Sequence, residues 1–228
     1  MIPLHDIWVV LPAYNEETVI CKVIETIQTC GFRRIIVIDD GSEDQTASKA
    51  ESCGAMVVQH LVNRGAGAST QTGIELARMK GCQYLAFMDA DGQHDPADLL
   101  KLWEKMEATQ CDIVIGSRFL QTSGKIPVTR IIFNGIANTL TNVFCKGRYT
   151  DTQSGLRLLN RKAIEKLELE IDGFGYCSEM LIVAEQEQLK IEEAASTVRY
   201  SAYSISKGQD FQIGITTALN FIWNTIFK

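Results

Sequence analysis

Two aspartates separated by a single residue, Asp89 and Asp91, are the side chains of this sequence best suited to chemistry. Carboxylates this close repel each other, and without a cation one of them would take up a proton. A divalent cation removes the conflict, since magnesium in proteins is held by one or two carboxylates, retained waters and substrate phosphate oxygens. The amide of Gln93 could add an oxygen or hold a bound water. The spacing predicts a Mg²⁺ or Mn²⁺ site that receives a phosphorylated substrate.

Two further loops carry carboxylates in a similar setting. Residues 12–17 (PAYNEE) and 39–42 (DDGS) each follow a short apolar run, as the aspartate pair does. Glu16 and Asp40 would be excessive as further magnesium ligands, but a carboxylate suits the N–H groups of a nucleobase or the hydroxyls of a ribose. Tyr14 could stack on the base. The loops together predict a nucleotide site, although DDGS also suits a turn that leads into a capped helix.

The elements that must hold these loops alternate between strand and helix over the first half of the chain. The expected strands are 7–11, 34–38, 56–60, 84–88 and 112–117, and the expected helices are 17–29, 44–52, 66–79 and 96–108. Ser42 and Asp95 are the expected caps of the second and fourth helices. This alternation predicts an α/β fold with a mainly parallel, doubly wound sheet. Ligands bind beyond the carboxyl ends of such strands, so the three loops should converge on one cleft.

The second half of the chain is less regular. Its expected helices are 128–144, 161–167 and 177–189, its expected strands are 156–159 and 191–200, and a polar loop follows at 201–208. Residues 63–67 (NRGAG) match neither a P-loop nor a dinucleotide fingerprint, and they predict a tight turn with close helix packing. Without an internal repeat or a linker, one continuous domain is the simplest organisation.

The charge of the chain is unevenly distributed. The net charge of −6 opposes broad nucleic-acid binding. Residues 118–162 nevertheless hold eight basic side chains and a single acid, Asp151. This segment predicts a local anionic partner, either a phosphorylated substrate or an acidic lipid surface, and a solvated basic face is equally compatible with it.

The seven cysteines are scattered without a CxxC pair. This pattern predicts neither a zinc site nor a disulfide framework, and it favours small buried thiols in a reducing cytosol. No stretch has the character of a signal peptide or of a membrane span. We therefore expect a cytoplasmic protein.

Five motifs in order along the chain resemble those of the family 2 glycosyltransferases with the GT-A fold. They are PAYNEE at 12–17, DDGS at 39–42, NRGAG at 63–67, DADGQH at 89–94 and GSR at 116–118. Within this family, DTQSGLR at 151–157 and YSISK at 203–207 are similar to the dolichol- and polyprenyl-phosphate sugar transferases. The resemblance covers about residues 5–210 and implies a Rossmann-like, mixed but mainly parallel sheet flanked by helices.

The resemblance also implies roles for individual residues, position by position. The nucleoside would be contacted by Pro12, Tyr14, Glu16, Ile38 and Asp40, and Ala90 would lie against the ribose side of the nucleotide. The metal would be held by Asp89, Asp91 and Gln93. Arg118 would reach the diphosphate or the acceptor phosphate, while Arg130, Ser154 and Lys207 would serve the acceptor.

Two departures from the family pattern stand out. The polyprenyl-phosphate enzymes usually carry an arginine where this chain has Ser201, and the nearest arginine is Arg199. The family's DADLQ is DADGQ here, a replacement of leucine by Gly92 that leaves the expected metal ligands unchanged. His94 is expected to lie behind those ligands or to face solvent, and Glu179 matches an acidic position of the family.

The resemblance implies a single displacement with inversion, in which a hexose passes from a GDP- or UDP-linked donor to a lipid phosphate. A phosphate monoester has a second pKa near 6 and is a dianion at neutral pH, so it needs surrounding positive charge more than a base. A sugar hydroxyl would need a general base. Asp151 is the best candidate base in that case, and a plain turn carboxylate is an equally good description of it.

The carboxyl-terminal stretch 211–228 has apolar residues at helical spacing after the single domain of residues 1–210. It could lie in a membrane interface, with the protein at the cytoplasmic face of the membrane, or pack on its own domain, a second copy or a membrane protein. Two other functions stay open. One is a transferase acting on a sugar hydroxyl in polysaccharide or glycolipid synthesis, and the other is a catalytically silent nucleotide-binding module.

Overall fold

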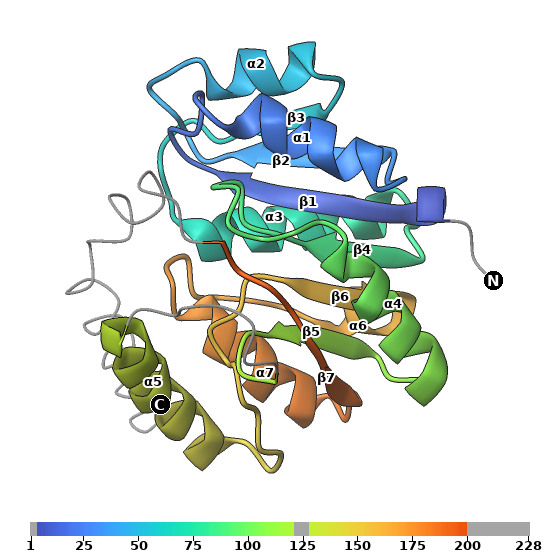
Figure 1. Ribbon diagram of the computed structural model, residues 1–228, viewed down its shortest axis with the longest axis vertical. Helices are drawn as coiled ribbons and strands as arrows, with labels where there is room; N and C mark the ends of the chain where they lie inside the picture. Colours follow the sequence, from blue (N-terminus) through green and yellow to red (C-terminus); the bar gives the residue numbers. More distant parts are fainter. Residues whose placement is uncertain (1–3, 121–127, 200–228) are drawn as a thin grey trace.

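The computed structural model describes residues 4–120 and 128–199, and it contains a seven-stranded sheet in the order β3-β2-β1-β4-β6-β5-β7 (Figure 1). The strands are β1 Ile7–Ala13, β2 Arg34–Asp39, β3 Met56–Gln59, β4 Tyr84–Phe87, β5 Ile113–Ser117, β6 Arg157–Asn160 and β7 Ile191–Ala195. The helices are η1 Leu4–Asp6, α1 Ile20–Thr29, α2 Thr46–Ser52, α3 Ala66–Met79, α4 Asp98–Thr109, α5 Val128–Phe144, α6 Arg161–Lys166 and α7 Tyr176–Gln186. The expected strand–helix alternation is confirmed.

The sheet is mixed. β6 runs antiparallel to both of its neighbours, β4 and β5, whereas the other paired strands are parallel. β6 lies between β4 and β5 although it follows them in the chain, so it joins the first half of the sheet to the β5–β7 edge. This arrangement confirms the expected mixed, mainly parallel sheet of the GT-A fold.

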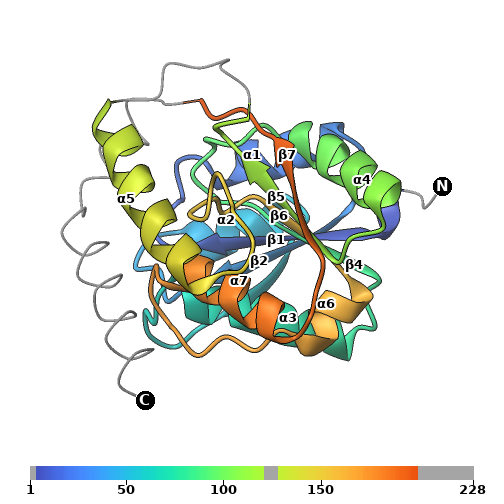
Figure 2. The same ribbon diagram turned by 90° about the horizontal axis from the view of Figure 1, so that it is seen from below.

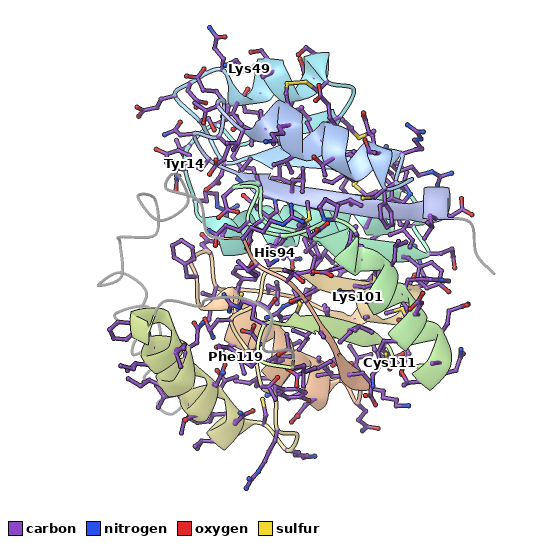
Figure 3. All side chains as sticks on the ribbon, in the orientation of Figure 1. Tyr14, Lys49, His94, Lys101, Cys111 and Phe119 are labelled. Carbon is purple, nitrogen blue, oxygen red and sulfur yellow. A yellow bond between two sulfur atoms is a disulfide. The ribbon has the colours of Figure 1, made fainter. Side chains whose placement is uncertain are left out.

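The core has two layers because successive strand residues point to opposite faces of the sheet. Val9 and Leu11 pack with α1, α2 and α4 on one face, whereas Val10 packs with α3, α6 and α7 on the other. Figure 2 shows these two groups of helices on either side of the sheet, and the side chains of Figure 3 fill the space between them. Burial on both faces explains why β1 and β2 are almost continuously apolar.

The two expected helix caps behave differently from the prediction. The Ser42 hydroxyl donates to Asp39 and accepts from the Asn15 N–H at 2.9 Å, so it ties two loops together and caps no helix. Asp44 instead accepts from the Thr46 N–H at 2.9 Å, where α2 begins. The prediction for Ser42 was therefore wrong. Asp95 accepts from the Ala97 N–H at 3.1 Å, one turn ahead of α4, whose cap position is Ala97 itself.

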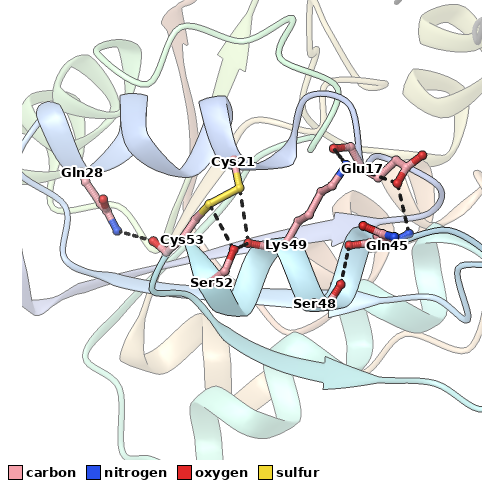
Figure 4. The surroundings of a disulfide bond; sticks show 8 residues. All are labelled: Glu17, Cys21, Gln28, Gln45, Ser48, Lys49, Ser52 and Cys53. Carbon is pink, nitrogen blue, oxygen red and sulfur yellow. Dashed lines mark hydrogen bonds and ion pairs between the residues drawn. A yellow bond between two sulfur atoms is a disulfide. The ribbon is translucent and has the colours of Figure 1, made fainter.

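One pair of cysteines is joined. Cys21 of α1 and Cys53, which follows α2, form a disulfide with their Cα atoms 5.7 Å apart (Figure 4). The prediction that every cysteine is unpaired was wrong here, because α1 and α2 pack side by side and bring together residues separated by 32 positions. The inference of a reducing compartment loses the support it drew from the cysteines. Five others are free, and three of these are buried.

Several expectations fall on segments that are not described. The strand expected at 191–200 ends at Ala195, and the polar loop 201–208 and the stretch 211–228 lie outside the described residues. Within residues 4–120 and 128–199, we find no helix with the length and apolar character needed to cross a membrane.

Candidate active site

The loops after β1 and β2 are locked to each other. Asn15 adopts a left-handed backbone conformation with φ 54°, and its side-chain oxygen accepts from the Glu43 N–H at 2.9 Å. The Glu16 N–H donates to the Thr46 hydroxyl at 2.8 Å, which ties the same loop to the first turn of α2. The two loops therefore form one rigid wall at the carboxyl edge of the sheet.

The residues expected at the nucleoside differ in what they expose. Tyr14 lies at the edge of the molecule and is 40% exposed (Figure 3). Glu16 is buried, and Pro12 is half-buried near the end of β1. Ile38 is wholly buried in the core beneath the sheet. Its backbone lies between β1 and β3 in the sheet, so this structure leaves no surface of Ile38 open to a nucleoside.

Asp40 is held from three sides. Its carboxylate lies 2.7 Å from His60 Nδ1 and accepts from the backbone N–H groups of Arg64, at 3.1 Å, and Gly65, at 2.6 Å. His60 Nε2 in turn lies 2.9 Å from the Thr72 hydroxyl on α3. Asp40 therefore fixes the glycine loop against the sheet. His60 was missed by the sequence reasoning, because no local pattern signals a histidine that comes 20 residues after its partner.

The glycine loop serves close packing, as expected. A Cβ on Gly65 or Gly67 would overlap the backbone of residues 171–172. The Asp172 carbonyl accepts from the N–H groups of Gly67, at 2.7 Å, and Ala68, at 3.1 Å, and so satisfies donors at the start of α3. Glu179 secures the neighbouring backbone by accepting from the Glu170 and Ile171 N–H groups at 2.8 and 3.0 Å.

Asp89 and Asp91 follow β4 and lie close enough to influence each other's ionisation. Desolvation raises the pKa of Asp89, but the hydrogen bond and charge of His94 and the charges of Arg118 and Arg157 outweigh it, so this pKa is lowered. Desolvation and the charge of Asp89 raise the pKa of Asp91, despite opposing hydrogen bonds from Gln93. The two carboxylates thus repel each other, and a divalent cation bound between them would offset this repulsion.

The neighbours of the aspartate pair hold it in place. His94 Nε2 lies 3.1 Å from Asp89 Oδ2, and the imidazole is almost completely buried (Figure 3). Gln93 donates its side-chain N–H to Asp91. A Cβ on Gly155 would overlap the Asp89 carboxylate, so this position tolerates only glycine while Asp89 keeps its place. Among the residues that the structure describes, no cluster of three or more acidic, cysteine or histidine side chains could by itself enclose a metal.

Arg118 follows β5 and pairs with Asp151. Its Nε and Nη2 atoms each donate to the carboxylate at 2.6 Å, and its backbone N–H donates to Oδ2 at 3.0 Å. Asp151 is fully buried, while the Arg118 side chain keeps 12% exposure. A carboxylate engaged in this way orients a cation and has no oxygen turned towards solvent.

Arg157, which ends the DTQSGLR motif and was counted among the basic side chains of residues 118–162, is a buried cation. It is fully buried at the start of β6 and donates to the carbonyls of Ser154, Thr152 and Cys177, each at 2.9 Å. Its Nη1 has no hydrogen-bond partner among the described residues. Its charge helps to lower the pKa of Asp89. Ser154 is also buried, and its hydroxyl accepts from the Leu156 N–H at 3.3 Å.

The segment 118–162 is not one continuous basic face. Arg157 is buried, Arg118 pairs with Asp151, and ion pairs join Arg161 to Glu165 and Lys162 to Asp112. Arg130 lies in the first turn of α5, but its side chain is not among those that the structure describes. Lys207 lies outside the described residues.

The end of the described chain lies against the aspartate loop. His94 forms a β-bridge with Val198, and the Arg199 N–H donates to the Gln93 carbonyl at 2.8 Å. The Arg199 side chain forms an exposed ion pair with Asp95 at 2.7 Å. The chain that continues towards residues 203–207 therefore leaves from beside the candidate metal ligands.

Comparison with known proteins agrees with this geometry. The family model described as glycosyl transferase family 2 matches residues 8–168. The chain is 32% identical to UDP-N-acetylglucosamine–dolichyl-phosphate N-acetylglucosaminyltransferase of Methanococcus voltae, over 91% of each chain. It is 30% identical to polyprenol monophosphomannose synthase of Mycolicibacterium smegmatis, over 77% of this chain and 69% of the relative.

A solved structure shares the fold. Glucosyl-3-phosphoglycerate synthase from Mycobacterium tuberculosis, in complex with Mn²⁺, UDP-glucose and phosphoglyceric acid, superposes with a TM-score of 0.68 at 23% identity. The superposition covers 94% of this chain and 78% of that one. The mixed sheet is that of the GT-A fold, and the family match with the sequence relatives identifies a nucleotide-sugar-dependent glycosyltransferase. The chain belongs to glycosyl transferase family 2.

Proposed function

We propose that this protein transfers a hexose from a nucleoside-diphosphate sugar to a polyprenyl phosphate of the dolichyl type, with inversion at the anomeric carbon. The acceptor class is supported by relatives that act on dolichyl phosphate or make polyprenol monophosphomannose, one of which matches over 91% of each chain. The donor is GDP- or UDP-linked, and the relative that uses UDP-N-acetylglucosamine supports a nucleoside-diphosphate sugar as the donor class.

The observation that carries this proposal is the state of Asp151. A hydroxyl acceptor needs a general base, and Asp151 was the best candidate in the sequence. Its carboxylate is fully buried and occupied at both oxygens by Arg118. Glu179, the other acidic position of interest, is committed to two backbone N–H groups. A phosphate acceptor, which is already ionised at neutral pH, needs neither carboxylate as a base.

The residues present fit a divalent cation. Asp89 and Asp91 would hold Mg²⁺ or Mn²⁺, with Gln93 keeping Asp91 oriented, because desolvation and the charge of Asp89 raise the pKa of Asp91. When bound, the ion would neutralise charge on the donor diphosphate. His94 and the buried Arg157 keep Asp89 ionised. Partial enclosure by two carboxylates leaves coordination positions for the diphosphate oxygens and water.

The remaining roles follow from position. Tyr14, Glu16 and Asp40 form the nucleoside wall, with the half-buried Pro12 and the buried Ile38 and Ala90 behind it. Arg118 places its charge beside the diphosphate or the acceptor phosphate, where a fixed cation stabilises the developing negative charge. Ser154 shapes the loop around Asp89, and Arg130 and Lys207 complete the acceptor side. Residues 1–210 form the catalytic domain, and 211–228 contact the cytoplasmic face of a membrane or a protein embedded in it.

The test is a transfer assay with the full chain. Radiolabelled UDP- and GDP-sugars with Mg²⁺ or Mn²⁺ are offered to a short polyprenyl phosphate, to the matching polyprenol and to a sugar acceptor. We expect label in the lipid phosphate product only, and none with D91N. Transfer to the sugar hydroxyl, with polyprenyl phosphate unused, would replace the proposal by the hydroxyl-acceptor alternative. A thermal-shift panel of nucleotide-sugars would identify the donor.

A further inference from the structure

Asn138 and Asn142, one helical turn apart on α5, use their side-chain amides to hydrogen-bond the backbone of the neighbouring loop 149–152. Asn138 Oδ1 accepts from the Thr152 N–H and hydroxyl at 2.9 and 2.8 Å, and Asn138 Nδ2 donates to the Thr150 carbonyl at 2.6 Å. Asn142 Nδ2 donates to the Tyr149 carbonyl, and Asn142 Oδ1 accepts from the Tyr149 N–H, each at 2.9 Å. The loop 149–152 thus has its backbone groups satisfied by helix side chains.

The same loop is held on its other side by β7. Glu193 accepts from the Thr150 N–H at 2.9 Å and from the Asp151 N–H at 3.1 Å. The loop is therefore clamped between α5 and β7. The residue in the middle of this clamp is Asp151, whose carboxylate holds the backbone and the guanidinium of Arg118. A chain of contacts runs from α5 through the loop to the site.

We propose that Asn138 and Asn142 are positioning residues for Arg118, acting through loop 149–152 and Asp151. This inference rests on the proposed function only in taking Arg118 as the cation that faces the transferred group. Without the asparagine amides, the loop backbone loses partners for two carbonyls and two N–H groups on its α5 side, and Asp151 is no longer fixed from that side. A displacement of about 1 Å at a charged group of an active site is enough to cost on the order of 100-fold in rate.

The position of α5 indicates that its movement would be transmitted to loop 149–152. Its outward face exposes Ile131, Ile132 and Ile136, so few contacts from the described residues anchor that face. On the side of α5 that faces α7, the hydroxyls of Thr141 and Ser178 form a hydrogen bond at 2.8 Å. A shift of α5 would therefore be passed to the loop through Asn138 and Asn142.

The first test uses no substrate. Hydrogen–deuterium exchange is compared between the wild-type chain, N138A and the matched control T139A, whose hydroxyl donates to the Gly135 carbonyl of its own helix. We expect exchange to accelerate at least about tenfold at 149–152 and at the Arg118 amide in N138A, with T139A unchanged. Unchanged protection of the Arg118 amide in N138A overturns the proposal. If N138A does not fold, N142A carries the same test.

The second test is kinetic. We expect kcat to fall about tenfold in N138A while the donor KM stays within about threefold, because the loss is in transition-state charge stabilisation. In an R118K background the further cost of N138A should shrink to about twofold, as expected for residues that act through one group. An equal cost in both backgrounds overturns the proposal and leaves a general packing role. A wild-type chain inactive on polyprenyl phosphate would instead refute the proposed function, and the exchange result would stand apart from it.

Discussion

The guanidinium of Arg118 and the carboxylate of Asp151 form a two-point ion pair in which both N–O distances are 2.6 Å. The residues are 33 positions apart and lie after β5 and before β6. Because Asp151 is completely buried and Arg118 is nearly so, the pair has one fixed geometry. The pKa of Asp89 is lowered because the hydrogen bond and charge of His94, together with the charges of Arg118 and Arg157, outweigh desolvation, so the field of this guanidinium reaches a candidate metal ligand.

Asp151→Asn should reduce kcat about 100-fold with polyprenyl phosphate as acceptor, since Arg118 loses its two-point partner and its position. Removing one member of a buried pair should also lower the free energy of unfolding by about 3 kcal/mol. Steady-state kinetics and urea unfolding measure the two effects. E187Q, which disrupts an exposed ion pair with Lys166, is the control and should leave both unchanged. Wild-type kcat in folded D151N would contradict this role.

Gly155→Ala should weaken donor binding at least about tenfold without unfolding the protein, because the added methyl group displaces the Asp89 carboxylate. Isothermal titration with the nucleoside diphosphate and Mn²⁺ measures the loss. Gly135→Ala is the matched control, since a Cβ there meets nothing within 4 Å. It should leave binding intact and slightly stabilise α5. Equal affinity of G155A and wild type would show that Asp89 does not touch the bound metal or diphosphate.

Chelation should sharply weaken donor binding. With EDTA present, no metal ion offsets the repulsion between the donor diphosphate and the Asp89–Asp91 pair, so the dissociation constant should rise at least about tenfold. Mg²⁺ or Mn²⁺ should restore the affinity in wild type, and D91N should show no such response. The measurement is titration with UDP and with GDP. The same affinity with and without EDTA would rule out the proposed metal role.

Reduction of the Cys21–Cys53 disulfide should destabilise the protein. The bond closes a loop of 32 residues, and cross-links of this length contribute about 3–4 kcal/mol. For a chain of this size the melting temperature should fall by about 10 °C. C53S should melt like the reduced wild type, while C30S, which removes a free cysteine, should melt close to the oxidised protein. Free thiols at both positions in a non-reducing peptide map would refute the bond.

Asp112 should make stability depend on pH. Desolvation raises its pKa, but hydrogen bonds from Lys162 at 2.8 Å, the Lys190 N–H at 2.8 Å and Asn160 at 3.0 Å outweigh it, so the folded pKa is lowered. A lowered carboxyl pKa contributes stability above the unfolded value of about 4, and this is lost as pH falls through the folded pKa.

Asp112→Asn should therefore lower the free energy of unfolding by about 1–3 kcal/mol at pH 7. The difference from wild type should shrink as the pH falls below about 4. Urea unfolding across pH 3–7 measures it. E165Q, which alters an exposed pair with Arg161, should track the wild type at every pH. A difference that stays constant with pH would mean that the Asp112 charge contributes nothing.

Much of the fold was readable from the sequence because it depends on local patterns. Apolar runs that alternate with amphipathic segments predicted the strands and helices, and the expected bounds of α3 and α5 match the structure. The rule that ligands bind beyond the carboxyl ends of strands then predicted that the loops after β1, β2 and β4 would meet. Gly65 and Gly67 were also read correctly as packing residues.

Other features were decided only by tertiary structure. The partnership of Asp40 with His60, of Asp151 with Arg118 and of Cys21 with Cys53 joins residues 20 to 33 positions apart. Nothing in the local spacing of such residues indicates whether the chain will bring them within hydrogen-bonding or bonding distance. Burial is decided in the same way, so Arg157 could be counted as a charge in the sequence but recognised as a buried cation near Asp89 only in the folded protein. The sequence by itself determined which chemical groups line the edge of the sheet, whereas the packing of distant segments determined which of those groups remain free to act.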